Sequence, residues 1–424
     1  MTDEKLQANT HSFDPRSTKP PARRARRGRL RAALVAGVLA VIVILGLVLV
    51  GNPLVDQTTP ATAPTLATAP TPATELTPAR EPTSSAFPTG DRVLAFVDGS
   101  VVKWIRADDG GVGTFASPCP GDPCSIDGIA WSPSGSALAV GFRDWAHGMA
   151  RTLIVRRDGS GPRTLRGCPG GAPAWSPDGS RIALGEDGGS EPLTTCDAGG
   201  GGMQVLSTRR SQMEFGPPSW SPDGRELAYS AHQIPTNDAI VVVSADGTGA
   251  RRIFRARAGT RWLGAPTWSP DGRRIAFLSY PSAYSYGDPM RLWIVNADGT
   301  EPHVVLEARH IGSPVWSPDG TRLAVQSFRD QLVTDSGYLD PSATDWSLIL
   351  MGADGSGQTQ LMKGSGGSVP VWDPSGRALA VFVDRDLRIV PADGSPARTV
   401  PGPVDYPSGL VPLIAWAPGD ATAS

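Results

Sequence analysis

"PTWSPDGRRIAF" occupies residues Pro266–Phe277, and the chain repeats this phrase almost unchanged. Close variants begin at Pro173 ("PAWSPDGSRIAL"), Pro218 ("PSWSPDGRELAY") and Pro314 ("PVWSPDGTRLAV"). Aligned on the tryptophan, the complete and weakened copies are separated by 44, 45, 48, 48, 56 and 44 residues, with anchors at Trp131, Trp175, Trp220, Trp268, Trp316, Trp372 and Trp416. A period of roughly 40–50 residues is typical of repeat proteins and propellers. The sequence therefore predicts a repeat architecture.

Each repeat predicts four short β-strands. The first strand ends at the tryptophan, and Ser-Pro-Asp-Gly then suits a type I turn. The second strand is the apolar "RIAF" segment, and a third ends in an Asp-Gly hairpin signal, as in "LWIVNADG" at Leu292–Gly299. A short fourth strand follows, for example at His303–Leu306. Because both faces of this meander are apolar, each unit needs neighbours stacked on both sides.

The two ends of the repeat region complement each other. Residues Asp91–Gly110 match the second and third strands of a repeat and lack a preceding tryptophan phrase. Residues Val411–Asp420 contain the phrase with nothing after it. We therefore expect an all-β, seven-bladed propeller of four-stranded blades over residues 91–420, in which the C-terminal strand completes the first blade. Closure of this kind removes exposed sheet edges.

The phrase P-x-W-S-P-D-G-x-x-I-A-F, followed by A-D-G, resembles the TolB-type, WD-like propeller repeats. Similar repeats form the N-terminal domain of prolyl-oligopeptidase-type peptidases. The resemblance covers about residues 91–420, although the phrase weakens to "WDPSG" at Trp372 and "WAPGD" at Trp416, and Gly202–Arg210 lacks the Asp-Gly turn. TolB has an α/β domain before its propeller, whereas this chain has a different N-terminal region. The resemblance therefore implies the fold and does not imply TolB's own role.

The N-terminal region predicts a membrane anchor. Residues 1–31 hold nine Lys or Arg and three acidic residues, and the uncharged segment Ala32–Gly51 is long enough to span a bilayer as a helix. The basic run Arg23–Arg31 predicts a cytoplasmic tail at residues 1–31, followed by a transmembrane helix at residues 32–51. A cleaved signal peptide is the alternative. We expect a single-pass protein of the cell membrane, with the propeller outside the cytoplasm.

Residues 52–90 are dominated by Pro, Thr and Ala and show no apolar period. Such a segment cannot bury a core, and we expect an extended stalk or an inert linker. The tail carries a net charge of +6, so the rest of the chain carries −8 of the total −2. An acidic body argues against a nucleic-acid partner.

The two ends of the predicted ring differ. The Ser-Pro-Asp-Gly and Ala-Asp-Gly turns fall on one end, and the long insertions fall on the other: Glu186–Gly201, Ala231–Asp238, Ser279–Pro289 and Ser327–Asp345. Loops on a rigid scaffold commonly carry binding residues. The candidate ligand-binding residues at this loop-rich end are Trp262, Tyr280, Tyr284, Tyr286, Tyr338, Tyr406 and His310. Aromatic side chains suit a sugar or a protein partner, and ordinary loop packing is the alternative.

No catalytic residues are predicted. The chain has no Gly-x-Ser-x-Gly elbow for a peptidase, and a propeller-type polysaccharide lyase or glycosidase is the main enzymatic alternative. We expect no metal and no cofactor, because His147, His232 and His310 have no short ligand spacing. One loop holds four aspartates that could bind calcium, and a simply solvated loop is the favoured alternative: Asp330, Asp335, Asp340 and Asp345.

The four cysteines lie beyond the predicted span, where disulfides are expected. Three pairings are possible, and we favour Cys119–Cys124, across a short Pro/Gly loop, together with Cys168–Cys196. Free thiols are the alternative. The sequence as a whole thus predicts a membrane-anchored, non-catalytic propeller that binds a protein or glycan outside the cell.

Overall fold

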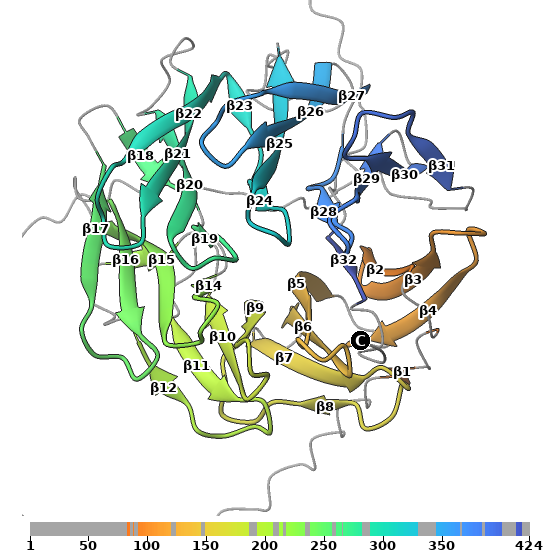
Figure 1. Ribbon diagram of the computed structural model, residues 1–424. Coiled ribbons are helices and arrows are strands. Elements are labelled where there is room, and N and C mark those ends of the chain that lie inside the picture. The colour runs from red at the N-terminus through yellow and green to blue at the C-terminus, as the bar shows by residue number, and fades with distance from the viewer. Residues whose placement is uncertain are drawn as a thin grey trace, which may run out of the picture. The chain divides into compact units, whose positions relative to one another are not determined.

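The computed structural model describes residues 83–84, 88, 92–119, 124–145, 149–185, 193–206, 212–214, 218–233, 238–256, 260–264, 266–281, 289–329, 345–364, 367–383, 386–400 and 413–417. They belong to one compact unit, Glu75–Ser424. Seven antiparallel sheets follow one another around a ring, which confirms the seven-bladed propeller (Figure 1). The predicted tail and span, and nearly all of the stalk, lie outside the described residues. No helix among the residues described is long and apolar enough to be a candidate membrane span.

Three of the seven sheets, which we call blades 1 to 3, come from the N-terminal half of the ring. Blade 1 contains β1 (Thr83–Ser84), β2 (Val93–Asp98), β3 (Val101–Arg106), β4 (Val112–Ser117) and β32 (Ile414–Trp416). Blade 2 contains β5 (Cys124–Trp131), β6 (Ala137–Asp144), β7 (Met149–Arg156) and β8 (Arg163–Thr164). Blade 3 contains β9 (Ala172–Trp175), β10 (Arg181–Gly185), β11 (Thr194–Asp197) and β12 (Gln204–Val205).

Blades 4 to 7 complete the ring, and in blades 4, 5 and 6 two short segments share the place of the inner strand. Blade 4 contains β13 (Gln212–Glu214), β14 (Ser219–Trp220), β15 (Glu226–Gln233), β16 (Ala239–Ser244) and β17 (Arg251–Arg255). Blade 5 contains β18 (Thr260–Leu263), β19 (Thr267–Trp268), β20 (Arg274–Pro281), β21 (Met290–Asn296) and β22 (His303–Ala308). Blade 6 contains β23 (His310–Ile311), β24 (Val315–Trp316), β25 (Arg322–Arg329), β26 (Asp345–Gly352) and β27 (Thr359–Gly364). Blade 7 contains β28 (Val371–Trp372), β29 (Ala378–Val383), β30 (Asp386–Pro391) and β31 (Arg398–Val400).

The ring closes through the C-terminal strand, as the sequence predicted. Strand β32 pairs with β2, with Leu94 opposite Trp416 and Phe96 opposite Ile414. The backbone amide of Ala417 also donates to the carbonyl of Val93 at 2.9 Å. Ile414 and Trp416 are buried in a cluster that includes residues of blade 7, so β32 seals blade 1 against its neighbour.

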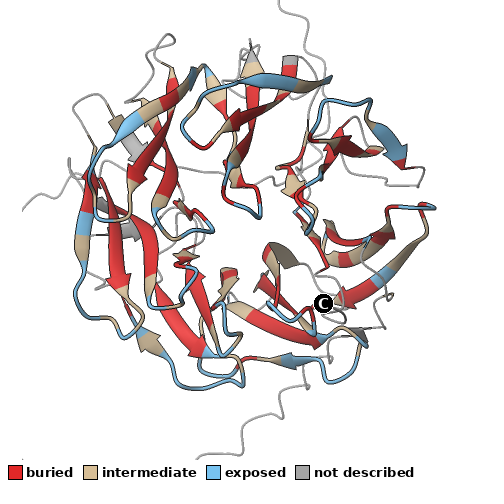
Figure 2. Ribbon diagram, viewed as in Figure 1, coloured by how far each residue is buried: buried red, intermediate tan, exposed pale blue. Residues whose placement is uncertain are grey.

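The repeated tryptophans hold neighbouring blades together. Five of the anchor indoles donate from Nε1 to the carbonyl of the residue that precedes the tryptophan of the previous blade, over 3.0–3.3 Å: Trp175 to Ala130, Trp220 to Ala174, Trp316 to Thr267, Trp372 to Val315 and Trp416 to Val371. The inner and middle strands are buried, and the exposed residues gather on the outer strands and turns (Figure 2). The repeated phrase is therefore explained by packing between blades.

The Ser-Pro-Asp-Gly turn also has a role in each interface. The serine hydroxyl donates to the aspartate two residues later, as Ser176 does to Asp178 at 2.6 Å, and accepts the amide of Arg181 at 2.9 Å. The turn glycine has a positive φ of 70° at Gly179, which a residue with a side chain rarely adopts. The proline of the previous blade, here Pro133, packs beside that glycine.

These hydrogen bonds hold the turn aspartates in their charged form. The hydroxyl of Ser176 and the amide and hydroxyl of Ser180 lower the pKa of Asp178 to about 2. The same contacts from Ser317 and Thr321 lower the pKa of Asp319 to about 2. The ordinary pKa of these carboxyl groups is 3.8, so an ionised turn aspartate stabilises the fold.

Two details differ from the sequence expectation. The segment Glu186–Gly201 was expected to be a loop-end insertion, but it contains the third strand of blade 3, β11, and the turn after it. "TTCD" is too short and polar to be recognised as a strand, and its burial depends on the neighbouring blades. In addition, β1 lies within the residues assigned to the stalk, and it pairs with the outer strand β4.

We expect removal of residues 413–424 to open the ring, because β2 then loses its partner strand and the buried Trp416 is lost. Loss of one buried tryptophan alone costs about 3–5 kcal/mol, so the Tm of the full-length chain should fall by about 10 °C or more. A chain that ends after Ala417 is the matched control and should melt like the parent. Equal melting of both truncations would contradict closure by β32.

The turn aspartates predict that the propeller loses stability in acid. Between pH about 4 and about 2 the unfolded chain binds more protons than the folded chain, because the folded pKa of Asp178 and Asp319 is about 2 rather than 3.8. Their contribution is therefore complete above that window and is lost as the pH falls through it. Thermal melts should show a falling Tm from pH 5 to pH 2.5. In an Asp178→Asn/Asp319→Asn double variant this dependence should be shallower, and an unchanged dependence would refute the assignment.

Candidate functional site

The antiparallel register divides the ring into two ends. The Ser-Pro-Asp-Gly turns and the Ala-Asp-Gly turns join strands at one end, which we call the turn end. The connections after β6, β15, β20 and β25, and those that lead into each inner strand, fall at the other, which we call the loop end. This is the division that the sequence predicted.

The structure describes three of the seven predicted ligand-binding residues at the loop end. Trp262 on β18 stands opposite Tyr280 on β20 in the sheet register of blade 5. Tyr280 is half-buried and packs on a core cluster shared by blades 5 and 6. His310 lies on β23 of blade 6, where burial and the nearby Arg309 lower its pKa. The other predicted residues, Tyr284, Tyr286, Tyr338 and Tyr406, lie outside the described residues.

The loop end of blade 2 carries an exposed aromatic residue that the sequence analysis missed. Trp145 follows β6 and is 50% exposed, and Met149 begins β7 and is 45% exposed. The guanidinium of Arg143 lies 5.8 Å from the Trp145 ring centroid, which is cation–π contact. The sequence feature that could have predicted this exposed residue is a tryptophan that ends the second strand of a repeat and does not belong to the repeated phrase.

Strand β5, which pairs with β6, holds a half-buried acid, Asp127. The strand has a register shift between Ile126 and Gly128, which places Asp127 at an irregular position. Burial raises the pKa of Asp127, and attraction to Arg143 opposes that rise. One carboxylate oxygen, Oδ2, has no hydrogen-bond partner. Acids with a perturbed pKa are more frequent at functional sites than elsewhere.

No cluster of three or more His, Cys, Asp or Glu with metal-binding geometry occurs in the part of the chain that the structure describes. His147 and the loop aspartates Asp330, Asp335 and Asp340 lie outside it, and the side chains of His232 and Asp345 are not described. The histidine and calcium hypotheses therefore stay untested.

All four cysteines form disulfides, with the pairing that we favoured. Cys119–Cys124 and Cys168–Cys196 each have a Cα–Cα separation of 6.2 Å. The first joins the end of blade 1 to the first strand of blade 2. The second ties the connection that enters blade 3 to β11, where Cys196 is fully buried. Cys196 is thus a strand residue and not, as expected, a residue of a loop-end insertion.

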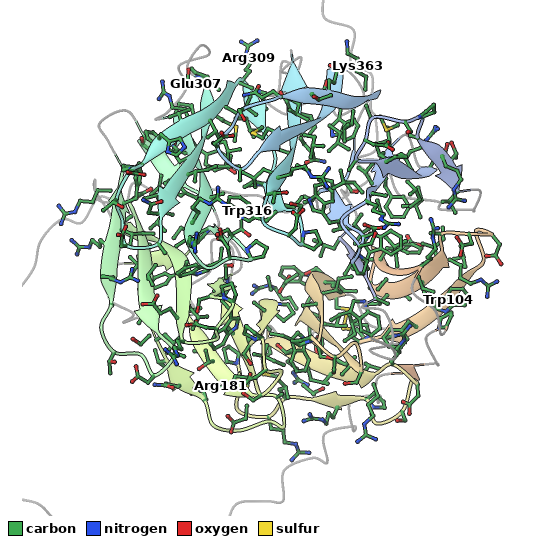
Figure 3. All side chains as sticks on the ribbon, in the orientation of Figure 1. Trp104, Arg181, Glu307, Arg309, Trp316 and Lys363 are labelled. Carbon is green, nitrogen blue, oxygen red and sulfur yellow. A yellow bond between two sulfur atoms is a disulfide. The ribbon has the colours of Figure 1, made fainter. Side chains whose placement is uncertain are left out.

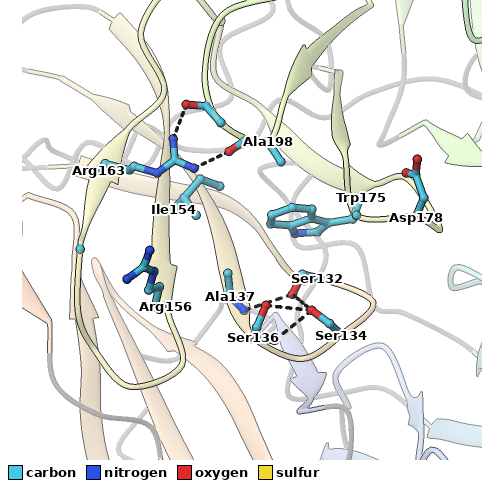
Figure 4. A pocket seen from close by; sticks show the side chains of 13 residues that line it. Ser132, Ser134, Ser136, Ala137, Ile154, Arg156, Arg163, Trp175, Asp178 and Ala198 are labelled. Atoms are coloured by element: carbon cyan, nitrogen blue, oxygen red, sulfur yellow. Dashed lines mark hydrogen bonds between the residues drawn. The ribbon is translucent and has the colours of Figure 1, made fainter. Parts of the chain in front are cut away.

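A pocket of about 550 Å³ lies at the turn end, between blades 2 and 3. Its walls include the ring of Trp175, the hydroxyls of the Ser132–Ser136 turn, and the guanidinium groups of Arg156 and Arg163 (Figure 4). This volume is within the usual range for small-molecule sites. The sequence analysis placed ligand binding at the opposite end and missed this pocket.

Beside the pocket, a small residue stands where two other blades have an arginine. In blades 5 and 6 the second strand begins with Arg274 or Arg322, and each guanidinium covers the tryptophan of the next blade. Arg274 lies 5.2 Å from the ring centroid of Trp316, which is labelled in Figure 3, and donates to the carbonyl of Gly320 at 3.2 Å. In blade 2 the same position is Ala137, and Trp175 is the one anchor tryptophan that is not fully buried. Blade 7 also has an alanine there, Ala378, and Trp416 stays buried, so the replacement contributes to the pocket without accounting for it alone. The departure is visible in the sequence as "WSPSGSAL".

The charged side chains of the pocket differ in the hydrogen bonds and ion pairs that they already form. Arg163 donates to the carbonyls of Ala198 and Gly199 across the interface. Asp178 accepts hydrogen bonds from Ser176 and Ser180 within its own turn. The exposed guanidinium of Arg156 makes no hydrogen bond or ion pair with the residues described, and Asp158, which attracts it, accepts hydrogen bonds from Ser160.

Comparison with known proteins agrees with the fold. Residues 187–331 match the family model described as the TolB beta propeller domain. No curated protein matches the sequence. The tricorn protease aligns with a TM-score of 0.56 and 13% identity, over 81% of this chain and 36% of that protein. An oligogalacturonate lyase in complex with manganese aligns with a TM-score of 0.54 and 17% identity, over 73% of this chain and 85% of the lyase.

A prolyl endopeptidase aligns with a TM-score of 0.53 and 10% identity, over 79% of this chain and half of the peptidase. Identities this low show a shared propeller fold and no shared activity. The matched residues 187–331 contain three complete copies of the Trp-Ser-Pro-Asp-Gly phrase, and other copies precede and follow them. The described chain is therefore a seven-bladed β-propeller, and its residues 187–331 match the TolB beta propeller domain.

Proposed function

We propose that this propeller is a non-catalytic binding module that recognises a protein partner through its loop end. We further propose that the Ala32–Gly51 segment anchors it in the membrane as a single-pass protein and displays it outside the cytoplasm. Two disulfides within the propeller support an oxidising location.

The observation that carries the proposal is the exposed indole of Trp145 at the loop end of blade 2, with Arg143 beside it. Tryptophan and arginine are enriched at protein interfaces, and tryptophan is prominent among the residues that contribute most binding energy. The side chain of Trp145 remains half-exposed despite its contact with Arg143, so its apolar ring is available to a partner. Met149, at the start of the next strand, is also exposed.

The enzymatic alternative, a polysaccharide lyase or glycosidase, has only the fold likeness to the oligogalacturonate lyase behind it. A shared propeller at 17% identity carries no catalytic residues from one protein to the other. The predicted aromatics Trp262 and Tyr280 also belong to the loop end, and we propose that they extend the partner surface from blade 2 to blade 5.

Photo-cross-linking from position 145 tests the surface. A photoreactive residue at position 145 of the full-length chain on intact cells should give a protease-sensitive cross-linked product. Position 203 is the matched control, because Met203 is 53% exposed and follows a turn-end hairpin. Trp145→Ala should weaken capture of the same partner by roughly thirtyfold, and Met203→Ala should not. A product sensitive only to polysaccharide-degrading enzymes would replace the protein partner with a glycan, and equal products from both positions would refute the surface.

The location has a separate test. Protease added to intact cells should release a fragment close in size to residues 75–424, the compact unit that contains the propeller. Lysed cells serve as the control for protease activity. Complete protection of the propeller in intact cells, with cleavage after lysis, would show that the orientation is wrong.

A further inference from the structure

We propose that the pocket between blades 2 and 3 binds a small sugar acid, that is, a pyranose ring that carries a carboxylate. This site is at the turn end, opposite the loop-end surface, and does not depend on the partner proposed there. Three features of its walls carry the argument: an indole face that no guanidinium covers, an exposed arginine that forms no ion pair with the residues described, and a row of hydroxyl groups.

The indole of Trp175 supplies a flat face for a ring. At the interface between blades 5 and 6, the guanidinium of Arg274 covers the ring of Trp316, 5.2 Å from its centroid. At the interface between blades 6 and 7, the guanidinium of Arg322 covers the ring of Trp372, 5.0 Å from its centroid. Ala137 cannot reach Trp175 in this way, and the ring lines the pocket instead. Its Nε1 remains bound to the carbonyl of Ala130, so the ring is held in place before any ligand arrives. Sugar rings stack on such aromatic faces.

The charge of the pocket favours an anionic ligand, whereas the interfaces that follow blades 5 and 6, which we call the sister sites, are filled by a guanidinium. Arg156 stands directly opposite Ala137 in the sheet, where blade 5 has Asn296 opposite Arg274 and blade 6 has Gly352 opposite Arg322. Arg274 is also paired with Asp271 of its own turn at 3.3 Å. In blade 2 that turn position is Ser134.

The result is a reversal of charge at one interface. The sister sites hold an arginine that is balanced by an aspartate, whereas this pocket has a cation on its wall and no acid on the same turn. The carboxylate of Asp178 is oriented by three hydrogen bonds from Ser176 and Ser180 and forms no ion pair with Arg156 in the described part of the chain. A ligand carboxylate can therefore form a charge-assisted hydrogen bond with Arg156.

The remaining wall suits a hydroxylated ligand. The hydroxyls of Ser132, Ser134 and Ser136 form a chain, with 3.3 Å between the first two oxygens and 2.8 Å between the last two. Gly179, which also lines the pocket, corresponds to Gly320 and Gly376, whose carbonyls accept hydrogen bonds from Arg274 and Arg322. Hydroxyl donors and acceptors beside a flat apolar face, together with one cation, match the groups of a uronate.

The test uses isothermal titration of the full-length chain with D-glucuronate as the probe. Glucose controls for the ring without the charge, and acetate controls for the charge without the ring. We expect saturable glucuronate binding and affinities at least about tenfold weaker for both controls, which corresponds to the loss of one charge-assisted hydrogen bond or one stacking contact. No binding of glucuronate, or equal binding of acetate, would overturn the proposal.

Two variants locate the site. Arg156→Gln should weaken glucuronate binding by about tenfold, whereas Arg225→Gln, at an exposed turn-end position of blade 4, should leave it unchanged. Ala137→Arg should fill the pocket as Arg274 and Arg322 fill theirs, abolish glucuronate binding and leave the Tm equal to or above that of the parent. Binding that persists in a folded Ala137→Arg variant would show that the sugar acid binds elsewhere.

Discussion

The structure depends on one constraint: a single four-stranded blade has two apolar faces and can bury neither by itself. Each blade therefore has to present a surface to the next one and receive a surface from the previous one. The indole of the repeated tryptophan meets this constraint at the inner edge, where Trp175, Trp220 and Trp316 donate to carbonyls of the preceding blade. The constraint also explains the closing strand, because without β32 the first blade would have no tryptophan to offer.

The repeats allow equivalent positions in different blades to be compared. Since the same position recurs in every blade, a departure at one interface can be compared with intact versions nearby. The arginine that begins the second strand in blades 5 and 6 fills the gap above the next tryptophan, and the alanine of blade 2 leaves a pocket of about 550 Å³ there. In blade 4 the same position is Glu226, which forms an ion pair with Arg251. The guanidinium of Arg251 also donates to the carbonyl of Ala297 in blade 5, so this arginine bridges the interface.

The charges of the ring are arranged by location. The outer rim carries solvated residues such as Glu307, Arg309 and Lys363, and the ion pair of Arg291 with Glu307 is exposed there (Figure 3). Exposed pairs of this kind contribute little to stability. The turn aspartates differ, because each accepts short hydrogen bonds from its own turn, as Asp178 and Asp319 show. Blade 2 instead combines an exposed tryptophan with a half-buried acid whose pKa is raised, and this combination suits recognition better than it suits stability.

The sequence by itself determined the architecture. The seven spaced tryptophans, the Ser-Pro-Asp-Gly turns and the split first repeat predicted the number of blades, the closing strand and the two ends of the ring, since these follow from local strand and turn chemistry. The disulfide pairing was also predicted, with three alternatives reduced to one by chain position. Strand β11 was missed because "TTCD" has no strand pattern of its own and is buried only by its neighbours. The pocket and the surface around Trp145 were decided by tertiary structure, because the exposure of Trp175 depends on how two neighbouring blades pack and is not a property of either sequence segment alone.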